Sequence, residues 1–203
     1  MVSSRLKEKF EGWVAPRVRI LASAGLTPNA LTLLGLAASL AAAFCYLNWR
    51  ISDALLPAAA ALVLISGLLD ALDGVLARAV GGASAFGGFL DSVADRYSDA
   101  VVLSAVVVAG LCDPVWGLAA VVGSIMVSYA RARAEAAGVG MASVGLAERA
   151  ERMLLLAAVT FAAYFRLDIL RWGVLLLAAL SHLTVLQRAV HFLRETGRRK
   201  ALY

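Results

Sequence analysis

The chain has 203 residues, of which 62% are hydrophobic and 16% are charged, and its formal net charge is +5. A soluble domain is about 45–50% apolar and about 25% charged, so a soluble domain this small could not bury so much apolar surface. The composition excludes an ordinary soluble domain and a disordered chain, and it indicates a chain embedded in a bilayer. Along the chain, the apolar runs predict an all-α membrane protein.

The N-terminal segment, residues 1–25, mixes Arg and Lys with apolar residues such as Leu6, Phe10 and Trp13 at roughly helical spacing. This pattern is typical of an amphipathic helix that lies on the membrane surface. We therefore predict three parts: an N-terminal cytoplasmic amphipathic interfacial helix at 1–25, a transmembrane domain of six helices at 26–193, and a basic cytoplasmic tail at 194–203.

Six apolar runs follow the first segment, and some of them begin at recognisable caps. Thr27-Pro28 and Asp113-Pro114 each place a capping side chain before a proline, which is favoured at the first helical position. A membrane-spanning helix needs about 20 residues. The pattern predicts spans near 27–47, 54–79, 85–111, 114–136, 149–166 and 171–193.

The distribution of basic residues predicts the orientation in the cell membrane. Six spans place both termini on one side, and with the N-terminus inside, the outer loops hold only Arg50, Arg166 and Arg171 of the 19 basic residues. The positive-inside rule then places both termini in the cytoplasm. Nucleic-acid binding is a competing explanation of the basic charge, but these residues flank the spans and lack an aromatic surface for reading bases, so no nucleic acid is expected.

Five aspartates lie between residues 70 and 99, within or beside predicted spans: Asp70, Asp73, Asp91, Asp95 and Asp99. A carboxylate at the centre of a span costs about 2.5–3.5 kcal/mol, so such a group indicates a function. Asp70 and Asp73 are three residues apart and Asp91 and Asp95 are four apart, so each pair projects from one face of a helix.

Four clustered carboxylates repel one another, and two divalent cations would neutralise them. All-oxygen ligands favour Mg²⁺, for which Mn²⁺ can substitute, and a pair of such ions can clamp a phosphoryl group during in-line displacement. The alternative is a set of buried ion pairs with Arg78 and Arg96, which leaves two acids unpaired. Gly74, the nearby glycine pairs and Arg78 are instead suited to a phosphate and metal site.

The acids belong to a longer pattern, Asp70-x2-Asp73-Gly74-x2-Ala77-Arg78-x8-Gly87-x3-Asp91-x3-Asp95. This pattern resembles the complete signature of the CDP-alcohol phosphotransferase family. The resemblance implies an enzyme that transfers a phosphatidyl-type group from a CDP-linked lipid to an alcohol and releases CMP. It also implies a homodimer.

The resemblance also implies roles for individual residues. Two Mg²⁺ ions per active site would be held by Asp70, Asp73, Asp91 and Asp95, and Asp95 would also be the catalytic base that takes the proton of the acceptor hydroxyl. The CDP-lipid would be bound by Asn29, Ala30, Leu31, Thr32, Gly74, Ala77, Arg78, Ser84 and Gly87.

Three further stretches, Leu26–Asn29, Ser128–Glu135 and Glu148–Arg152, are similar to the branch of this family whose acceptor is an inositol phosphate. That similarity implies transfer of diacylglycerol phosphate or archaeol phosphate to inositol 1-phosphate (1D-myo-inositol 3-phosphate). The acceptor's phosphate would be bound by Ser128, Arg131, Arg152 and Arg188. In that branch a lysine is common at the position of Arg131 and a proline at that of Ala150.

Three alternatives stay open at this point. The same chemistry could use glycerol 3-phosphate as acceptor. An intramembrane prenyltransferase also uses aspartate pairs and Mg²⁺, although it would normally need more spans and would leave Gly74, Ala77 and Arg78 unexplained. A divalent-cation carrier could use the acids as its ion pathway.

Overall fold

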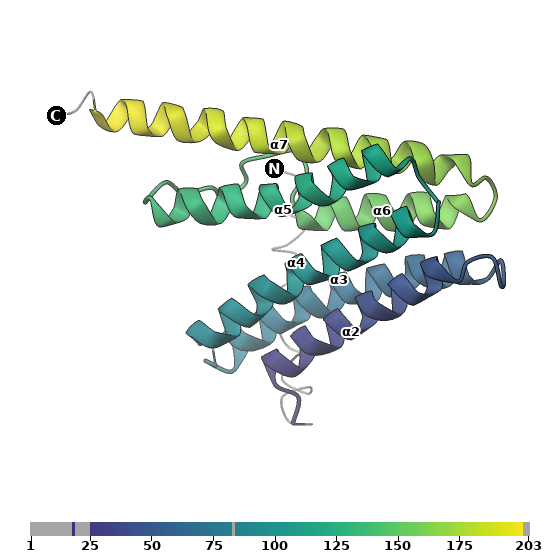
Figure 1. The fold of residues 1–203 in the computed structure, drawn as a ribbon. Coiled ribbons are helices and arrows are strands. Elements are labelled where there is room, and N and C mark those ends of the chain that lie inside the picture. The colour runs from purple at the N-terminus through teal and green to yellow at the C-terminus, as the bar shows by residue number, and fades with distance from the viewer. Residues whose placement is uncertain (1–17, 19–24, 83, 201–203) are drawn as a thin grey trace.

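The computed structural model describes residues 18, 25–82 and 84–200, and within them the chain forms six helices and no strand (Figure 1). The amphipathic helix predicted at 1–25 falls outside the described residues, apart from Val18 and Gly25. The helices are α2 (Pro28–Leu47), α3 (Leu55–Ala79), α4 (Ala85–Val108), α5 (Pro114–Ala136), α6 (Arg149–Ala163) and α7 (Asp168–Lys200).

Side-chain caps begin several of these helices. Thr27 Oγ1 accepts a hydrogen bond from Ala30 N at 3.2 Å at the start of α2, and Asp113 Oδ1 accepts one from Val115 N at 2.9 Å at the start of α5. The caps that the sequence predicts at these two positions are confirmed. Proline follows each cap at the first helical position, where its missing N–H leaves no hydrogen bond unmade.

Four helices, α2, α3, α5 and α7, are long and apolar enough to cross a membrane. The protein is therefore a multi-pass membrane protein. The other two helices differ for separate reasons, because α6 has only 15 residues and the 24 residues of α4 include Asp91, Asp95, Arg96 and Asp99. The last helix is longer than the predicted span and continues to Lys200.

The principal helix contacts form a closed ring: α2 packs on α3 and α4, α3 on α6, α6 on α7, α7 on α5, and α5 on α4. Inside the ring lies an apolar core that includes Tyr46, Leu56, Val106 and Leu177. One buried polar link crosses it, where the hydroxyl of Tyr46 lies 2.6 Å from that of Thr160. A buried hydroxyl needs such a partner, because water cannot supply one.

The path of the chain brings six helix ends together. The end of α3, the start of α4, and the ends of α5 and α7 lie on the left of Figure 1. Each pair of successive helices runs in opposite directions, so the start of α2 and the start of α6 belong to the same end of the bundle. The candidate site residues on these helices lie in the half of each helix that is nearer this end.

Candidate active site

Carboxylates from two helices meet at this end of the bundle. Oxygen atoms of Asp70 on α3 and of Asp91 and Asp95 on α4 all lie within 4.8 Å of one another. The four-residue spacing of the two α4 aspartates places them on one helical face, and that face is turned toward α3. Three of the four predicted metal ligands are therefore close enough to share an ion.

The fourth predicted ligand, Asp73, is held from a third helix. Its side chain is buried, and its Oδ2 accepts a hydrogen bond of 2.6 Å from the Thr32 hydroxyl on α2. The same hydroxyl lies 3.2 Å from the carbonyl oxygen of Pro28, so one hydrogen atom is available for two acceptors. Thr32, predicted from the resemblance as a CDP-lipid ligand, thus contacts the acidic cluster directly.

The donor set fits a hard divalent cation. Asp91 Oδ1 is buried and has no hydrogen-bond partner among the described residues. Leaving a carboxylate oxygen buried without a donor is costly, so this atom calls for a cation. Carboxylate oxygens are the ligands that Mg²⁺ and Mn²⁺ prefer. The cluster can therefore bind a divalent metal.

Arg149, at the first position of α6, inserts its guanidinium among these acids. Its Nη1 lies 2.7 Å from Asp70 Oδ2 and 2.9 Å from Asp95 Oδ1, and its Nε lies 3.5 Å from Asp99 Oδ1. Sequence reasoning missed this residue. A usable signal was present, because an arginine at a helix N-terminus is disfavoured by the helix dipole unless acidic side chains lie nearby.

The predicted alternative places Arg78 and Arg96 among the acids as their ion-pair partners. Within the described residues, Arg149 pairs with Asp70, Asp95 and Asp99, and Arg152 pairs with Asp99. Arg96 instead donates a hydrogen bond to the carbonyl oxygen of Ser92.

Several predicted CDP-lipid residues from separate segments lie side by side. A Cβ added at Gly87 would stand 3.1 Å from Ser84 Oγ and 3.2 Å from Asn29 Oδ1, so these three residues are in contact. A Cβ added at Gly74 would meet the guanidinium of Arg78 at 3.4 Å. The absence of a side chain at each glycine leaves room for polar groups to approach the backbone. Of the remaining predicted residues, Ala30 and Ala77 are half-buried and Leu31 is packed in the core.

Of the arginines predicted to bind the acceptor's phosphate, two are buried and one is exposed. Arg152 has only 3% of its side chain exposed and donates to Asp99 Oδ2 at 2.7 Å. Arg188, equally buried, donates to the carbonyl oxygen of Val144 at 2.9 Å. The side chain of Arg131 is 46% exposed and pairs with Glu135.

These arginines form one basic group. Arg188 donates to the carbonyl oxygen of Val127 on α5, and its Nη2 lies 3.9 Å from Glu148 Oε1 just before α6. Arg188 therefore lies between the helices that carry Arg131 and Arg152. Ser128, half-buried, lies one turn before Arg131 on α5. Arg131 on α5, Arg149 and Arg152 at the start of α6 and Arg188 on α7 thus form a basic wall, which meets the acidic cluster at Arg149.

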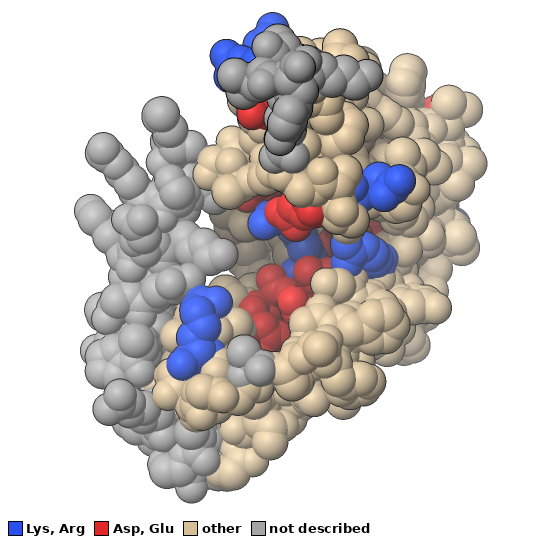
Figure 2. Space-filling model, turned by 90° about the vertical axis from the view of Figure 1, so that its left-hand side faces the viewer, with Lys and Arg blue, Asp and Glu red and all other residues tan. Residues whose placement is uncertain are grey.

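The acids and Arg149 line a hollow at the end of the bundle. Its lining includes Thr32, Asp70, Asp73, Asp95 and Arg149. Figure 2 shows this end, where acidic side chains gather in the hollow and basic side chains lie along its edge. The juxtaposition provides both cation ligands and anion-binding groups within one opening.

Comparison with known proteins places the chain in a family. A family model described as CDP-alcohol phosphatidyltransferase matches residues 25–186. The chain is 42% identical to the archaetidylinositol phosphate synthase of Pyrococcus horikoshii over 186 residues, covering 91% of this chain and 93% of that one. It is 34% identical to the phosphatidylinositol phosphate synthase of Mycobacteroides abscessus over 205 residues, covering 94% and 87%.

Solved structures of phosphatidylinositol phosphate synthase from Mycobacterium tuberculosis share this fold at 33% identity and a TM-score of 0.75. One contains CDP-DAG, with 88% of this chain and 92% of that chain aligned, and another contains manganese and citrate, with 88% of each aligned. The match favours neither a prenyltransferase nor a cation carrier. The chain belongs to the CDP-alcohol phosphatidyltransferase family and is an enzyme of that class.

Proposed function

We propose that this protein transfers a diacylglycerol phosphate or archaeol phosphate group from a CDP-lipid to the hydroxyl of inositol 1-phosphate and releases CMP. The observation that carries the proposal is the basic wall of Arg131, Arg149, Arg152 and Arg188, which meets the acidic cluster through the contacts of Arg149 with Asp70 and Asp95. An acceptor that is itself a phosphate ester needs such cations, whereas a neutral alcohol does not. The names of the relatives support the same acceptor.

Asp70, Asp73, Asp91 and Asp95 would hold the metal ions. Bound there, two divalent ions would neutralise the pyrophosphate and stabilise the charge that develops on it during displacement. Thr32 holds the Asp73 carboxylate in place from α2 through the 2.6 Å hydrogen bond. A side chain that orients a metal ligand through a hydrogen bond in this way is worth about 10–100-fold in metal affinity.

Asp95 would accept the proton of the acceptor hydroxyl. The hydroxyl oxygen then forms a bond to the lipid-side phosphorus, the bond from that phosphorus to the bridging oxygen breaks, and CMP leaves with the electron pair. A carboxylate that also binds a metal is a weak base, so its contribution comes from its position next to the attacking oxygen. The hollow is lined by Asp95 and Arg149 together, which supports placing the acceptor there.

The cytidine diphosphate would lie over the segment that contains Gly74, Ala77, Arg78 and Gly87, with Asn29, Ala30, Leu31, Thr32 and Ser84 at its side. The contact of Gly87 with Ser84 and Asn29 supports this placement. We further propose that all six helices span the cell membrane, that both termini and the active site face the cytoplasm, and that the enzyme is a homodimer. The antiparallel course of the helices would place both termini on one side if all six span the membrane, and the positive-inside rule favours the cytoplasmic side.

The acceptor is tested by supplying purified enzyme with CDP-lipid, Mg²⁺ and either inositol 1-phosphate or glycerol 3-phosphate. We expect CMP release with inositol 1-phosphate at least about tenfold faster, which corresponds to about 1.4 kcal/mol of preference. The assay is run once with CDP-diacylglycerol and once with CDP-archaeol as the CDP-lipid. Turnover with glycerol 3-phosphate alone would establish the alternative acceptor.

The exposed member of the basic wall allows a second test. Replacing Arg131 with Ala is expected to raise the KM for inositol 1-phosphate about tenfold, because a charge-assisted hydrogen bond worth about 1.5–3 kcal/mol is lost. Arg133→Ala is the matched control, since a residue two positions along a helix points to a different face. Steady-state CMP release gives both values, and equal effects of the two substitutions would remove Arg131 from the pocket.

A further inference from the structure

A fifth aspartate, Asp99, extends the acidic face of α4 by one more turn. It follows Asp95 by four residues and therefore lies on the same side of the helix. Among the described residues it is not one of the carboxylates that converge within 4.8 Å, which are those of Asp70, Asp91 and Asp95. It also lies beyond the signature pattern, which ends at Asp95. Its role has to be found in its own contacts.

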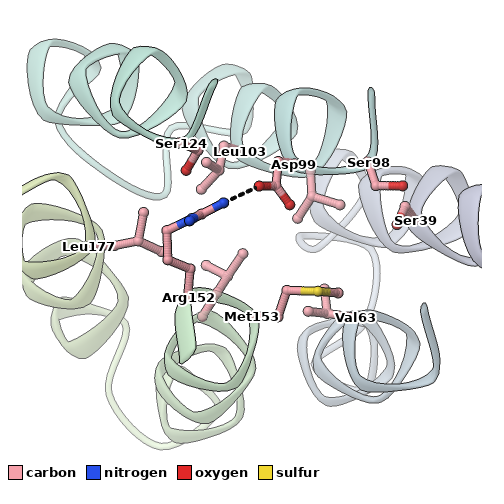
Figure 3. Close-up of a pocket in the computed structure, with 11 residues that line it drawn as sticks. Ser39, Val63, Ser98, Asp99, Leu103, Ser124, Arg152, Met153 and Leu177 are labelled. Atoms are coloured by element: carbon pink, nitrogen blue, oxygen red, sulfur yellow. Dashed lines mark hydrogen bonds and ion pairs between the residues drawn. The ribbon is translucent and has the colours of Figure 1, made fainter. Parts of the chain in front are cut away.

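Those contacts are with two arginines of one helix. Asp99 Oδ2 accepts from Arg152 Nη2 at 2.7 Å, and its Oδ1 lies 3.5 Å from Arg149 Nε. Figure 3 shows Asp99 facing Arg152 across the space between α4 and α6. The Asp99 side chain is 11% exposed and that of Arg152 3%, so the group is well shielded from water. One carboxylate thus joins the two cations at the start of α6.

The surroundings make this carboxylate hard to replace. A cavity of about 20 Å³ next to the pair is walled mainly by apolar residues, including Val102, Leu103 and Leu177. Such a space holds about one water molecule. Asp99 is the partner in the ion pair that Arg152 makes within the described chain. Both groups would be unstable alone in these surroundings, because an unpaired buried charge is strongly disfavoured.

We propose that Asp99 is a positioning residue that orients Arg149 and Arg152 toward the phosphate of the acceptor. This inference rests on the proposed function, because it assumes a phosphorylated acceptor. Arg149 contacts Asp70 and Asp95 through Nη1 but Asp99 through Nε. When the carboxylates of Asp70 and Asp95 serve as metal ligands, the contact with Asp99 is the one that remains. The guanidinium then keeps its orientation, with its Nη groups free to donate to an anion.

The proposal predicts a specific kinetic effect of Asp99→Asn. We expect the KM for inositol 1-phosphate to rise about tenfold or more, while the KM for the CDP-lipid stays within about twofold, since the charge-assisted hydrogen bond to Arg152 is weakened and the ion pair with Arg149 is lost. Mn²⁺ affinity, measured by isothermal titration calorimetry without substrate, should also stay within about twofold. Asp113→Asn at the start of α5 is the matched control, because that aspartate lies at the opposite end of the bundle.

A second variant, Asp99→Glu, distinguishes a loss of folding from a loss of acceptor binding. Glutamate preserves the charge opposite Arg152, so this variant should fold, and melting in detergent checks that. Its longer side chain displaces the carboxylate, and we expect a smaller rise of the acceptor KM, about threefold.

Three results would overturn the proposal: an unchanged acceptor KM in a folded Asp99 variant, an equal rise of both KM values, or a large loss of Mn²⁺ affinity. The last would make Asp99 a metal ligand. If the wild-type enzyme released no CMP with inositol 1-phosphate, the proposed function itself would fail, which is a separate outcome.

Discussion

Replacing Asp95 with Asn is expected to reduce CMP release by about 10³-fold or more, since a positioned general base alone contributes about 10²–10⁴-fold. Asparagine has nearly the same shape, but it cannot accept the proton of the acceptor hydroxyl and is a weaker ligand for a hard cation. The contacts that bring Asn29, Ser84 and Gly87 together do not involve Asp95. Binding of the CDP-lipid should therefore stay measurable.

The measurement is release of labelled CMP at saturating substrates, with CDP-lipid binding followed by calorimetry. Asp53→Asn is a suitable control, because Asp53 is exposed just before α3 and lies at the opposite end of the bundle from the acidic cluster. Activity of Asp95→Asn above about a tenth of the wild-type value would contradict its role as the base.

The second large effect is expected for metal binding by Asp91→Asn. We expect Mn²⁺ affinity to fall by about 100-fold or more, because even residues behind the ligands cost about 10–100-fold when removed. The substitution is not expected to lower the stability of the metal-free protein. Asparagine removes one negative charge from three that lie within 4.8 Å, so the metal-free variant should unfold at the same or a higher temperature than the wild type.

Electron paramagnetic resonance of free Mn²⁺ gives the affinity, and thermal unfolding in detergent with and without Mn²⁺ gives the stability. Chelation should abolish CMP release in the wild type, and Mg²⁺ or Mn²⁺ should restore it. A purely structural role for Asp91 would show the reverse pattern, with unchanged Mn²⁺ affinity and a lower melting temperature in the metal-free protein.

The helix boundaries could largely be predicted from local signals. The starts of α2 and α5 follow from Thr27-Pro28 and Asp113-Pro114, because a cap and a following proline act within one turn. The bounds of the last helix differed from the prediction. The predicted span ends at 193, where the apolar run stops, whereas the helix extends from Asp168 to Lys200 because its polar residues continue it.

The acidic residues of the candidate site could be predicted from the sequence more readily than its basic residues. Two aspartates a helical turn apart in an apolar segment are costly wherever they lie, so Asp91 and Asp95 are informative without any structure. An arginine near the end of a span has many ordinary roles at the lipid headgroups. The helix-dipole argument applies to Arg149 at the first position of α6, but the prediction relied on the resemblance, which implied a role for Arg152.

From the sequence alone, the chain is recognisable as a helical membrane protein, and Asp70, Asp73, Asp91 and Asp95 are predicted as metal ligands, because composition and helical spacing can be read within each segment. Which cation meets those acids depends on the tertiary structure. Arg149 lies 79 positions after Asp70 in the sequence, and the two meet because α6 packs on α3. Asp99 contacts both Arg149 and Arg152 because α4 and α6 face each other across the ring. Contacts over such separations depend on how the whole bundle closes, which no segment encodes alone.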